Sequence, residues 1–323
     1  MGYDKQKFAQ STGAYDLHLA QWLTEMAIGY QPQGIIADAI FPIVRVGKQT
    51  DWYPVFSRQE ALTIEDTSRA PGTEAKKITR SVSSGSYFAK NYAIKTELTL
   101  EDRVNMDAGL ATEIVGGRAR YILNKLMLDW DRRVSNLVNS TSNVGSSAAP
   151  TSAWNGAGSP LTNLWTCIDN VKYATGYRPN RVVFGAKAWD SFRRDTTVRN
   201  LIYGVNNGGG YVNLPQVKTV FEIDDMLVGQ SFFENANEAQ AESVQVIWPD
   251  NVLVTFTAPN ATREDPSFGY SFRWAGGVPE MAVEVLPYNA AIKSEEIEAA
   301  YYQDEKITAK EYAFLIRAVN SSQ

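Results

Sequence analysis

Residues 99–139 read TLEDRVNMDAGLATEIVGGRARYILNKLMLDWDRRVSNLVN, and this stretch, which has no proline, decides the fold. Its apolar residues mostly recur every three or four positions, the period of a helix with one buried face. Thr99 is suited to cap the helix, because Glu101 and Asp102 follow in the first turn, where acidic side chains stabilise the helix dipole. The apolar positions are Val104, Ala111, Ile114, Ile122, Leu126, Trp130, Val134 and Leu137.

The length of this helix predicts the shape of the molecule. At about 1.5 Å per residue, a single helix over 99–139 would span roughly 60 Å. A compact chain of this size would have a diameter near ~50 Å. We therefore expect an elongated molecule with this helix as its spine. Gly116 and Gly117 fall near the helix middle, where glycine is unfavourable. They indicate a bend or a close contact there, or else two helices in sequence.

The residues before the helix predict an extended hairpin with a polar end. Residues 50–56 and 77–98 favour strands, with the apolar side of the second strand at Tyr92, Ile94 and Leu98. Between them, residues 57–76 are charged and turn-forming. Such a segment has little apolar surface to bury against its own chain. We interpret this segment as an extension that contacts a partner. The alternative is a surface loop that contacts nothing.

The rest of the chain predicts short helices and many strands. A short amphipathic helix is expected over 16–28, an extended arm over 34–46 and a Ser/Gly/Ala-rich linker over 141–160. A turn is expected at Asp304-Glu305-Lys306. Helices are expected over 161–174 and 186–195, and strands over 181–185, 226–233, 244–248, 252–257, 271–274, 281–286, 296–302 and 312–319. This arrangement is α+β and not a wound parallel sheet.

Composition excludes several classes of function. The chain has one histidine, His18, and one cysteine, Cys167, so a catalytic triad or a Cys/His metal site has too few residues. No apolar run approaches the ~18 residues of a membrane span. The net charge of −5 argues against a large nucleic-acid-binding surface. The glycines at 208–210 lack the lysine of a phosphate-binding loop and indicate a flexible loop. We expect no enzyme activity, cofactor or metal.

The order of these elements resembles the major capsid proteins of tailed double-stranded DNA bacteriophages, whose fold is shared with encapsulins and the herpesvirus capsid floor. The matching phrases are IADAIFPIVRV at 36–46, RVVFGAKAW at 181–189 with residues 198–204 after it, and AFLIR at 313–317. The resemblance implies five parts: an N-terminal arm (1–49), an extended loop hairpin (50–98), a peripheral domain with the spine helix (99–177), an axial domain (178–285) and return strands of the peripheral domain (286–323).

The resemblance implies a structural subunit that self-assembles into the icosahedral head enclosing the phage genome. Pentamers and hexamers would be joined by contacts of the extended loop and the arm. The implied helix bend is at Gly116 and Gly117, and the implied axial loop contains Gly208, Gly209 and Gly210. The candidates for contact between subunits are Trp52, Tyr53, Arg58, Glu60, Arg69, Glu74, Lys76 and Lys77.

The implied partners are other copies of the chain, a portal, a decoration protein and double-stranded DNA held without sequence-specific binding. No long charged helical segment precedes the arm, so the resemblance implies a separate scaffolding protein. The implied location is the virion, after assembly in the host cytoplasm. Two alternatives stay open: an encapsulin-like shell around an enzyme cargo, and a soluble α+β binding protein or enzyme.

Overall fold

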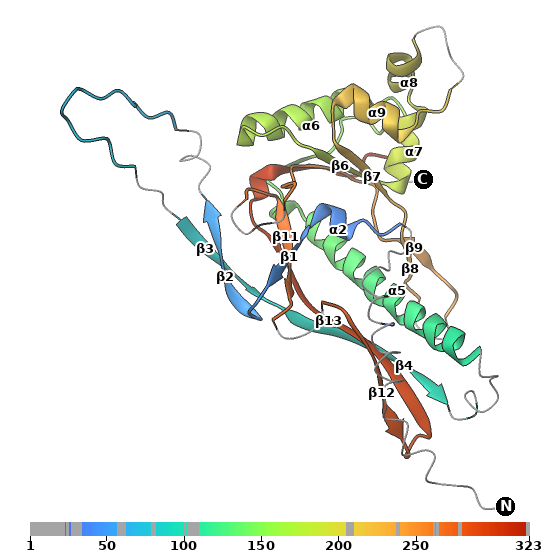
Figure 1. Cartoon of the computed structure of the whole chain (residues 1–323). Coiled ribbons are helices and arrows are strands. Elements are labelled where there is room, and N and C mark those ends of the chain that lie inside the picture. Colours follow the sequence, from blue (N-terminus) through green and yellow to red (C-terminus); the bar gives the residue numbers. More distant parts are fainter. Residues whose placement is uncertain are drawn as a thin grey trace, which may run out of the picture.

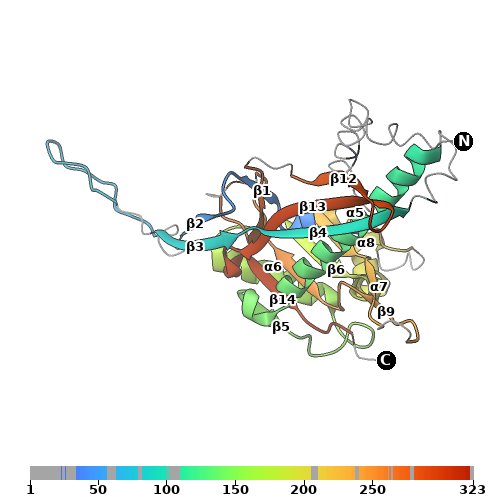
Figure 2. The same ribbon diagram turned by 90° about the horizontal axis from the view of Figure 1, so that it is seen from below.

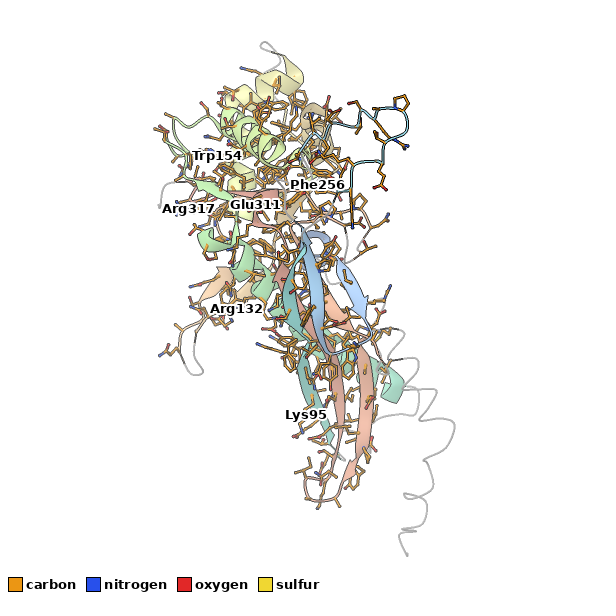
Figure 3. The ribbon with its side chains drawn as sticks, turned by 90° about the vertical axis from the view of Figure 1, so that its left-hand side faces the viewer. Lys95, Arg132, Trp154, Phe256, Glu311 and Arg317 are labelled. Atoms are coloured by element: carbon orange, nitrogen blue, oxygen red, sulfur yellow. The ribbon has the colours of Figure 1, made fainter. Side chains whose placement is uncertain are left out.

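The computed structural model of the chain describes residues 23, 26, 34–56, 63–78, 82–99, 101, 110–204, 210–236, 240–260, 262, 265–276 and 280–320. Within these residues, two five-stranded sheets and two short strand pairs combine with helices, which confirms the α+β class. Figure 1 shows an elongated molecule, as expected from the spine helix, with a long loop projecting from one side. In Figure 3, Lys95 lies toward one end, on the first sheet, and Trp154 and Arg317 lie at the other end, beside the second sheet.

The first sheet is organised around β13 (Ser294–Ile307), the longest strand. On one side β13 pairs antiparallel with β4 (Lys90–Thr99), and on the other with β12 (Ala282–Asn289) and β11 (Gly269–Trp274). The strand β1 (Ile43–Val46) runs parallel to β11 at the edge. Every second residue of β4 is more buried, including Tyr92, Ile94 and Leu98, which confirms the predicted inward face.

The spine helix α5 (Leu110–Val138) packs its apolar side against β4 and β13. Figure 2 shows these two strands running side by side along the helix. The predicted helix is confirmed over these 29 residues, and the alternative of two helices is wrong because α5 continues through both glycines. Thr99 ends β4 and Glu101 is helical, while residues 102–109, with Val104, lie outside the described residues. The buried residues of α5 include Ala119, Ile122, Leu123, Leu126, Trp130, Val134 and Val138.

The second sheet has the order β5-β14-β10-β6-β7 and carries four helices. Its strands are β5 (Ser146–Ala148), β6 (Arg181–Gly185), β7 (Asp225–Gly229), β10 (Val252–Thr255) and β14 (Ala313–Ile316). The helices are α6 (Pro160–Thr175), α7 (Ala186–Arg194), α8 (Thr196–Tyr203) and α9 (Leu214–Phe221). The predictions of α6, β6 and α7 are confirmed, whereas the sequence analysis missed α8 and α9.

One expected domain limit does not follow these sheets. The limit at residue 285 cuts through β12, and β11 and β12 belong with β13 in the first sheet. The strand β14, which follows residue 286, pairs with β10 in the second sheet. The described part of the chain therefore passes from one sheet to the other more often than the five consecutive parts imply.

Three local expectations are wrong. The turn expected at 304–306 lies inside β13, where Asp304 accepts a hydrogen bond from Phe88 N (2.9 Å) and Glu305 pairs with Arg133 (3.0 Å), so these acidic residues are accommodated in a strand. The strand expected over 226–233 is two strands, β7 and β8 (Phe232–Glu234). The extended arm contains one short helix, α2 (Ala37–Ile40), before β1.

The remaining described elements are small. The strand β9 (Val244–Val246) pairs with β8, and short 3-10 helices cover Thr141–Asn143 and Lys310–Tyr312. Of the amphipathic helix expected over 16–28, only Leu23 and Met26 lie within the described residues, and both are helical. Leu23 is fully buried in the cluster that contains α5.

A buried carboxylate joins three separate parts of the chain. Asp131 on α5 is fully buried and accepts hydrogen bonds from Ile36 N (3.2 Å), just before α2, from Ser231 Oγ, and from Trp248 Nε1 (2.8 Å). Buried donors and acceptors are costly when they lose their partners. Asp131 therefore fixes the arm and the segment around β8 and β9 against the spine helix.

We expect Asp131→Asn to lower the free energy of unfolding by about 2–3 kcal/mol, because the amide NH2 group would face buried donors. Urea denaturation of the purified chain measures this loss. Trp248→Phe, which removes one donor and keeps the carboxylate, is the matched control, and the two losses should not be additive. A loss for Asp131→Asn no larger than that of an ordinary surface substitution would contradict the role of this carboxylate.

The same residue predicts a pH dependence. Burial raises the pKa of the Asp131 carboxyl above its ordinary value, although its hydrogen bonds to Ser231, Trp248 and Ile36 oppose this. The folded chain therefore keeps this proton to higher pH than the unfolded chain, and the contribution to stability falls as pH rises through the raised pKa. The stability difference between wild type and Asp131→Asn should be larger at about pH 4 than at about pH 7. An equal difference at both would contradict the raised pKa.

The open space beside Gly117 predicts a stabilising substitution. A Cβ atom at this exposed position would meet no atom within 4 Å. We expect Gly117→Ala to raise the free energy of unfolding by about 0.5–1 kcal/mol, because alanine favours the helix. Gly145→Ala is the control, since its Cβ would lie 2.7 Å from Glu311 Cα and should destabilise the chain. Thermal denaturation compares the two, and a loss of stability in Gly117→Ala would refute the expectation.

Candidate inter-subunit surfaces

The base of the extended hairpin is fixed to the chain by stacked aromatic rings. The hairpin consists of β2 (Thr50–Phe56) and β3 (Val82–Phe88), which pair antiparallel. Tyr53 and Tyr87 each stack on Phe272 of β11, with ring centroids 5.2 and 4.6 Å apart. Tyr87 Oη also donates a hydrogen bond to Lys48 O (3.1 Å). All three rings are buried, so the base of the hairpin belongs to the core of the subunit.

Gly85 allows this packing. It lies opposite Tyr53 in the hairpin, and a Cβ atom on it would lie 2.3 Å from Tyr53 Cζ. The ring of Tyr53 therefore crosses β3 where only glycine leaves room. Tyr53 is 7% exposed and packs within its own subunit, so we do not propose it as a contact to another one. Trp52 points to the opposite face of the strand and is 70% exposed.

The hairpin continues into a loop, residues 63–78, that stands away from the body. Figure 1 and Figure 2 show this loop projecting far beyond both sheets. Ile64 is 96% exposed and Ile78 is 65% exposed, although both are apolar. A turn closed by hydrogen bonds from Thr73 to Ala70 O reverses the chain, with Gly72 at φ +81°. The loop therefore presents large apolar side chains that its own subunit leaves in water.

The charges of this loop are balanced. Lys76 forms an ion pair with Glu65 across the loop, and Ser68 N donates a hydrogen bond (2.9 Å) that lowers the pKa of Asp66. The loop carries three acidic and three basic side chains, which are Glu65, Asp66, Glu74, Arg69, Lys76 and Lys77. A partner surface of mixed charge suits such a loop better than a strongly charged polymer.

The structure places four of the eight predicted contact residues on this loop. Arg69, Glu74, Lys76 and Lys77 are exposed there. Arg58 and Glu60 lie outside the described residues. The sequence analysis did not select Ile64 and Ile78, because it treated the segment as polar, although each is an apolar residue inside a charged run.

A charged network ties the strands beside the hairpin to the spine helix. Arg133 of α5 donates hydrogen bonds to Glu305 Oε1 and Tyr301 Oη, each at 3.0 Å. Its guanidinium also lies 3.6 Å from the ring centroid of Tyr92. Burial opposes the charge of Arg133, but Tyr301 and Glu305 raise its pKa above the ordinary value. The adjacent Asp304 accepts the hydrogen bond from Phe88 N, so the network reaches the end of the hairpin.

A second candidate surface lies at the helical end of the molecule, formed by α7, α8 and α9 (Figure 1). Tyr211, between α8 and α9, is 72% exposed, and Leu201 of α8 is also exposed. Gly208 and Gly209 of the predicted axial loop lie outside the described residues. A Cβ on Gly210 would lie 2.8 Å from the ring of Tyr203. Gly116 and Gly117 lie far from this end, inside α5.

The described residues offer little chemistry for catalysis. Among them, no cluster of three His, Cys, Asp or Glu residues could hold a metal ion. Cys167 is buried, and burial raises the pKa of its thiol to about 12, which makes it unreactive at neutral pH. Within the same residues, no helix is both long and apolar enough to cross a membrane.

Comparison with solved structures defines the class of the protein. A phage-related protein from Bordetella bronchiseptica RB50 superposes with a TM-score of 0.72 at 16% identity, covering 94% of this chain and 97% of that one. The capsid protein of Cyanophage P-SCSP1u gives 0.56 at 10% identity, covering 90% of each chain. A virus-like particle from Pyrococcus furiosus gives 0.55 at 12% identity, covering 94% of this chain and 100% of that one. The chain has the fold of capsid subunits.

Sequence comparison narrows this class. The major capsid protein of Pseudomonas phage JBD67 is 22% identical over 262 residues, covering 79% of this chain and 83% of its relative. The major capsid protein of Burkholderia phage BcepMu is 23% identical over 265 residues, with the same coverage. No protein-family model matches the chain. The chain is thus related to phage major capsid proteins, and it is a structural protein and not an enzyme, as the sequence analysis predicted.

The packing of Tyr53 over Gly85 predicts a substitution that loosens the hairpin base. We expect Gly85→Ala to lower the free energy of unfolding by roughly 1–3 kcal/mol, because the ring must leave its place on Phe272. Thermal denaturation and hydrogen exchange of β2 and β3 measure the effect. Gly47→Ala, at the nearby turn before β2, is the matched control, because its Cβ would meet no atom within 4 Å. Equal stability of the two variants would contradict the packing described.

Proposed function

We propose that this chain is the structural subunit that self-assembles into the icosahedral head enclosing a phage genome. Pentamers and hexamers of the subunit would be joined by contacts of the arm and of the extended hairpin. The observation that carries this proposal is the hairpin itself, whose base is buried within the subunit and whose loop projects with exposed apolar residues. The similarity to phage major capsid proteins supports it independently.

The loop at residues 63–78 would lie over the adjacent subunit. Burial of apolar surface is favourable by about 25 cal/mol per Å², and Ile64, Ile78 and Trp52 offer surface that a neighbour can cover. The balanced charges of Arg69, Glu74, Lys76 and Lys77 would form ion pairs at the rim of this contact. Closed symmetric assembly repeats each contact many times, so a contact of modest strength is sufficient for a stable shell.

We further propose that each domain consists of one sheet and the helices packed against it. The first sheet with α5 would form the peripheral domain, and the second sheet with α6 to α9 would form the axial domain. The helical end would then face the five-fold and six-fold centres of the shell. The arm and the extended hairpin would connect neighbouring subunits at the periphery.

The proposed partners besides further copies are a scaffolding protein, a portal, a decoration protein and double-stranded DNA. The net charge of −5 supports a container that encloses DNA without holding it through many phosphate contacts. Assembly would occur in the host cytoplasm, and the mature subunit would reside in the virion. The Pyrococcus furiosus particle has the same fold, but the curated sequence relatives are phage proteins, which favours a genome over an enzyme as the content.

The projecting loop predicts a variant that folds but does not assemble. We expect the double substitution Ile64→Ser and Ile78→Ser to change the free energy of unfolding by less than about 0.5 kcal/mol, because both side chains are exposed. Particle formation, measured by light scattering and electron microscopy, should be lost or strongly reduced. Thr67→Ser in the same loop is the matched control and should assemble normally. Normal particles from the double variant would contradict a clamping role for the loop.

A further inference from the structure

Three arginines line one cavity at the helical end of the subunit. The cavity has a volume of about 540 Å³. Arg193 and Arg194 come from the last turn of α7, and Arg199 comes from α8. Among the described residues, Gly210 and Tyr211, in the segment leading to α9, also line it. Two consecutive helices, separated only by Asp195, thus bring three guanidinium groups to one place.

The nearby carboxylates leave much of this positive charge unneutralised. Asp190 pairs with Arg193 (2.5 Å). Asp195 caps α8, where its carboxylate accepts hydrogen bonds from the first backbone N–H groups of that helix. Among the described residues, no carboxylate forms an ion pair with Arg194 or Arg199. The buried Nε atoms of Arg193 and Arg199 also have no hydrogen-bond partner in that part of the chain.

The wall of the cavity is held in place. Tyr203 Oη donates a hydrogen bond to Tyr211 O (2.8 Å) and contacts Gln216 Oε1 (3.0 Å). Gln216 Oε1 also accepts a hydrogen bond from Asn213 N (3.1 Å), as part of the capping box of α9. The guanidinium of Arg193 lies 6.0 Å from the ring centroid of Tyr211. The segment that carries Gly210 and Tyr211 is therefore fixed to both α8 and α9.

Helix stability alone explains only two of the three arginines. Arg193 and Arg194 lie at the C-terminal end of α7, where a cation stabilises the helix dipole. Arg199 lies in the first half of α8, close to the positive end of that helix, where the dipole disfavours a cation. Its position on the cavity is thus better explained by a bound anion than by its own helix.

We propose that this cavity binds a small, multiply charged phosphate anion, such as a polyphosphate or a nucleoside triphosphate. The planar guanidinium group matches two phosphate oxygens at once, which makes arginine well suited to this ligand. The volume lies in the range of small-ligand pockets, about 300–1,000 Å³. A half-open cavity of this size has room for a compact anion.

A consequence for assembly rests on the proposed function. If the helical ends of five or six subunits meet around an axis, each brings an excess of positive charge to the same region. Like charges at short range oppose this approach. A multivalent anion in each cavity would neutralise them and favour the closed ring.

The test is calorimetric titration of the purified chain with inorganic tripolyphosphate at physiological salt. We expect saturable binding at one site per chain. Arg199→Gln and Arg193→Gln should each weaken it about tenfold or more, because each removes a charged hydrogen-bond donor. Arg199→Lys keeps the charge and should weaken it less. Arg120→Gln, an exposed arginine on α5, is the matched control and should bind as the wild type.

Circular dichroism and thermal denaturation establish that each variant is folded. The proposal is overturned if the wild type shows no saturable binding, or if folded Arg199→Gln and Arg193→Gln bind like the wild type. It is also overturned if a duplex DNA oligonucleotide competes as strongly as tripolyphosphate, since the site would then bind the backbone of DNA. Electron microscopy of the same preparations separates the two claims: particles without binding contradict only this site, and binding without particles contradicts only the proposed shell.

Discussion

The base of the extended hairpin is buried within the subunit, whereas its loop is exposed to water, and the proposed mode of assembly depends on this contrast. At the base, Tyr53 and Tyr87 stack on Phe272 and bury the strands within the subunit. In the projecting loop, Ile64 and Ile78 remain in water because their own chain provides no surface to cover them. A projecting loop is useful for clamping a neighbour only if its base does not move. The aromatic stack, together with Gly85, provides that fixed base.

The rest of the subunit is connected to this base through α5 and β13. Arg133 links the spine helix to Glu305 and Tyr301 on β13 and lies over Tyr92 on β4. Asp131, two residues earlier, fixes the arm and the segment near Trp248 to the opposite side of the same helix. The spine helix therefore connects the strands beside the hairpin with the arm and with the segment near Trp248.

The sequence predicts the long elements of this fold, in which an apolar pattern repeats many times. It predicts the short helices and the contacts between distant residues poorly. The spine helix and β4 are predicted correctly because their apolar periodicity persists over many residues. The helices α8 and α9 were missed because each has only eight residues, although the N-cap Asp195 and the capping box at Asn213 were readable signals. The inward position of Tyr53 was not readable, because it depends on Gly85 and on Phe272, which is distant in sequence.

The most direct test of the proposed shell is to find what the projecting loop contacts in an assembled particle. A photoreactive amino acid at position 64, in particles made from a mixture of light and heavy isotope-labelled chains, reports whether each cross-link joins one chain or two. We expect closed particles in which position 64 is cross-linked mainly to a different chain. Particles whose cross-links from position 64 lie only within one chain, or a chain that forms no particles with its scaffolding protein, would contradict the central claim.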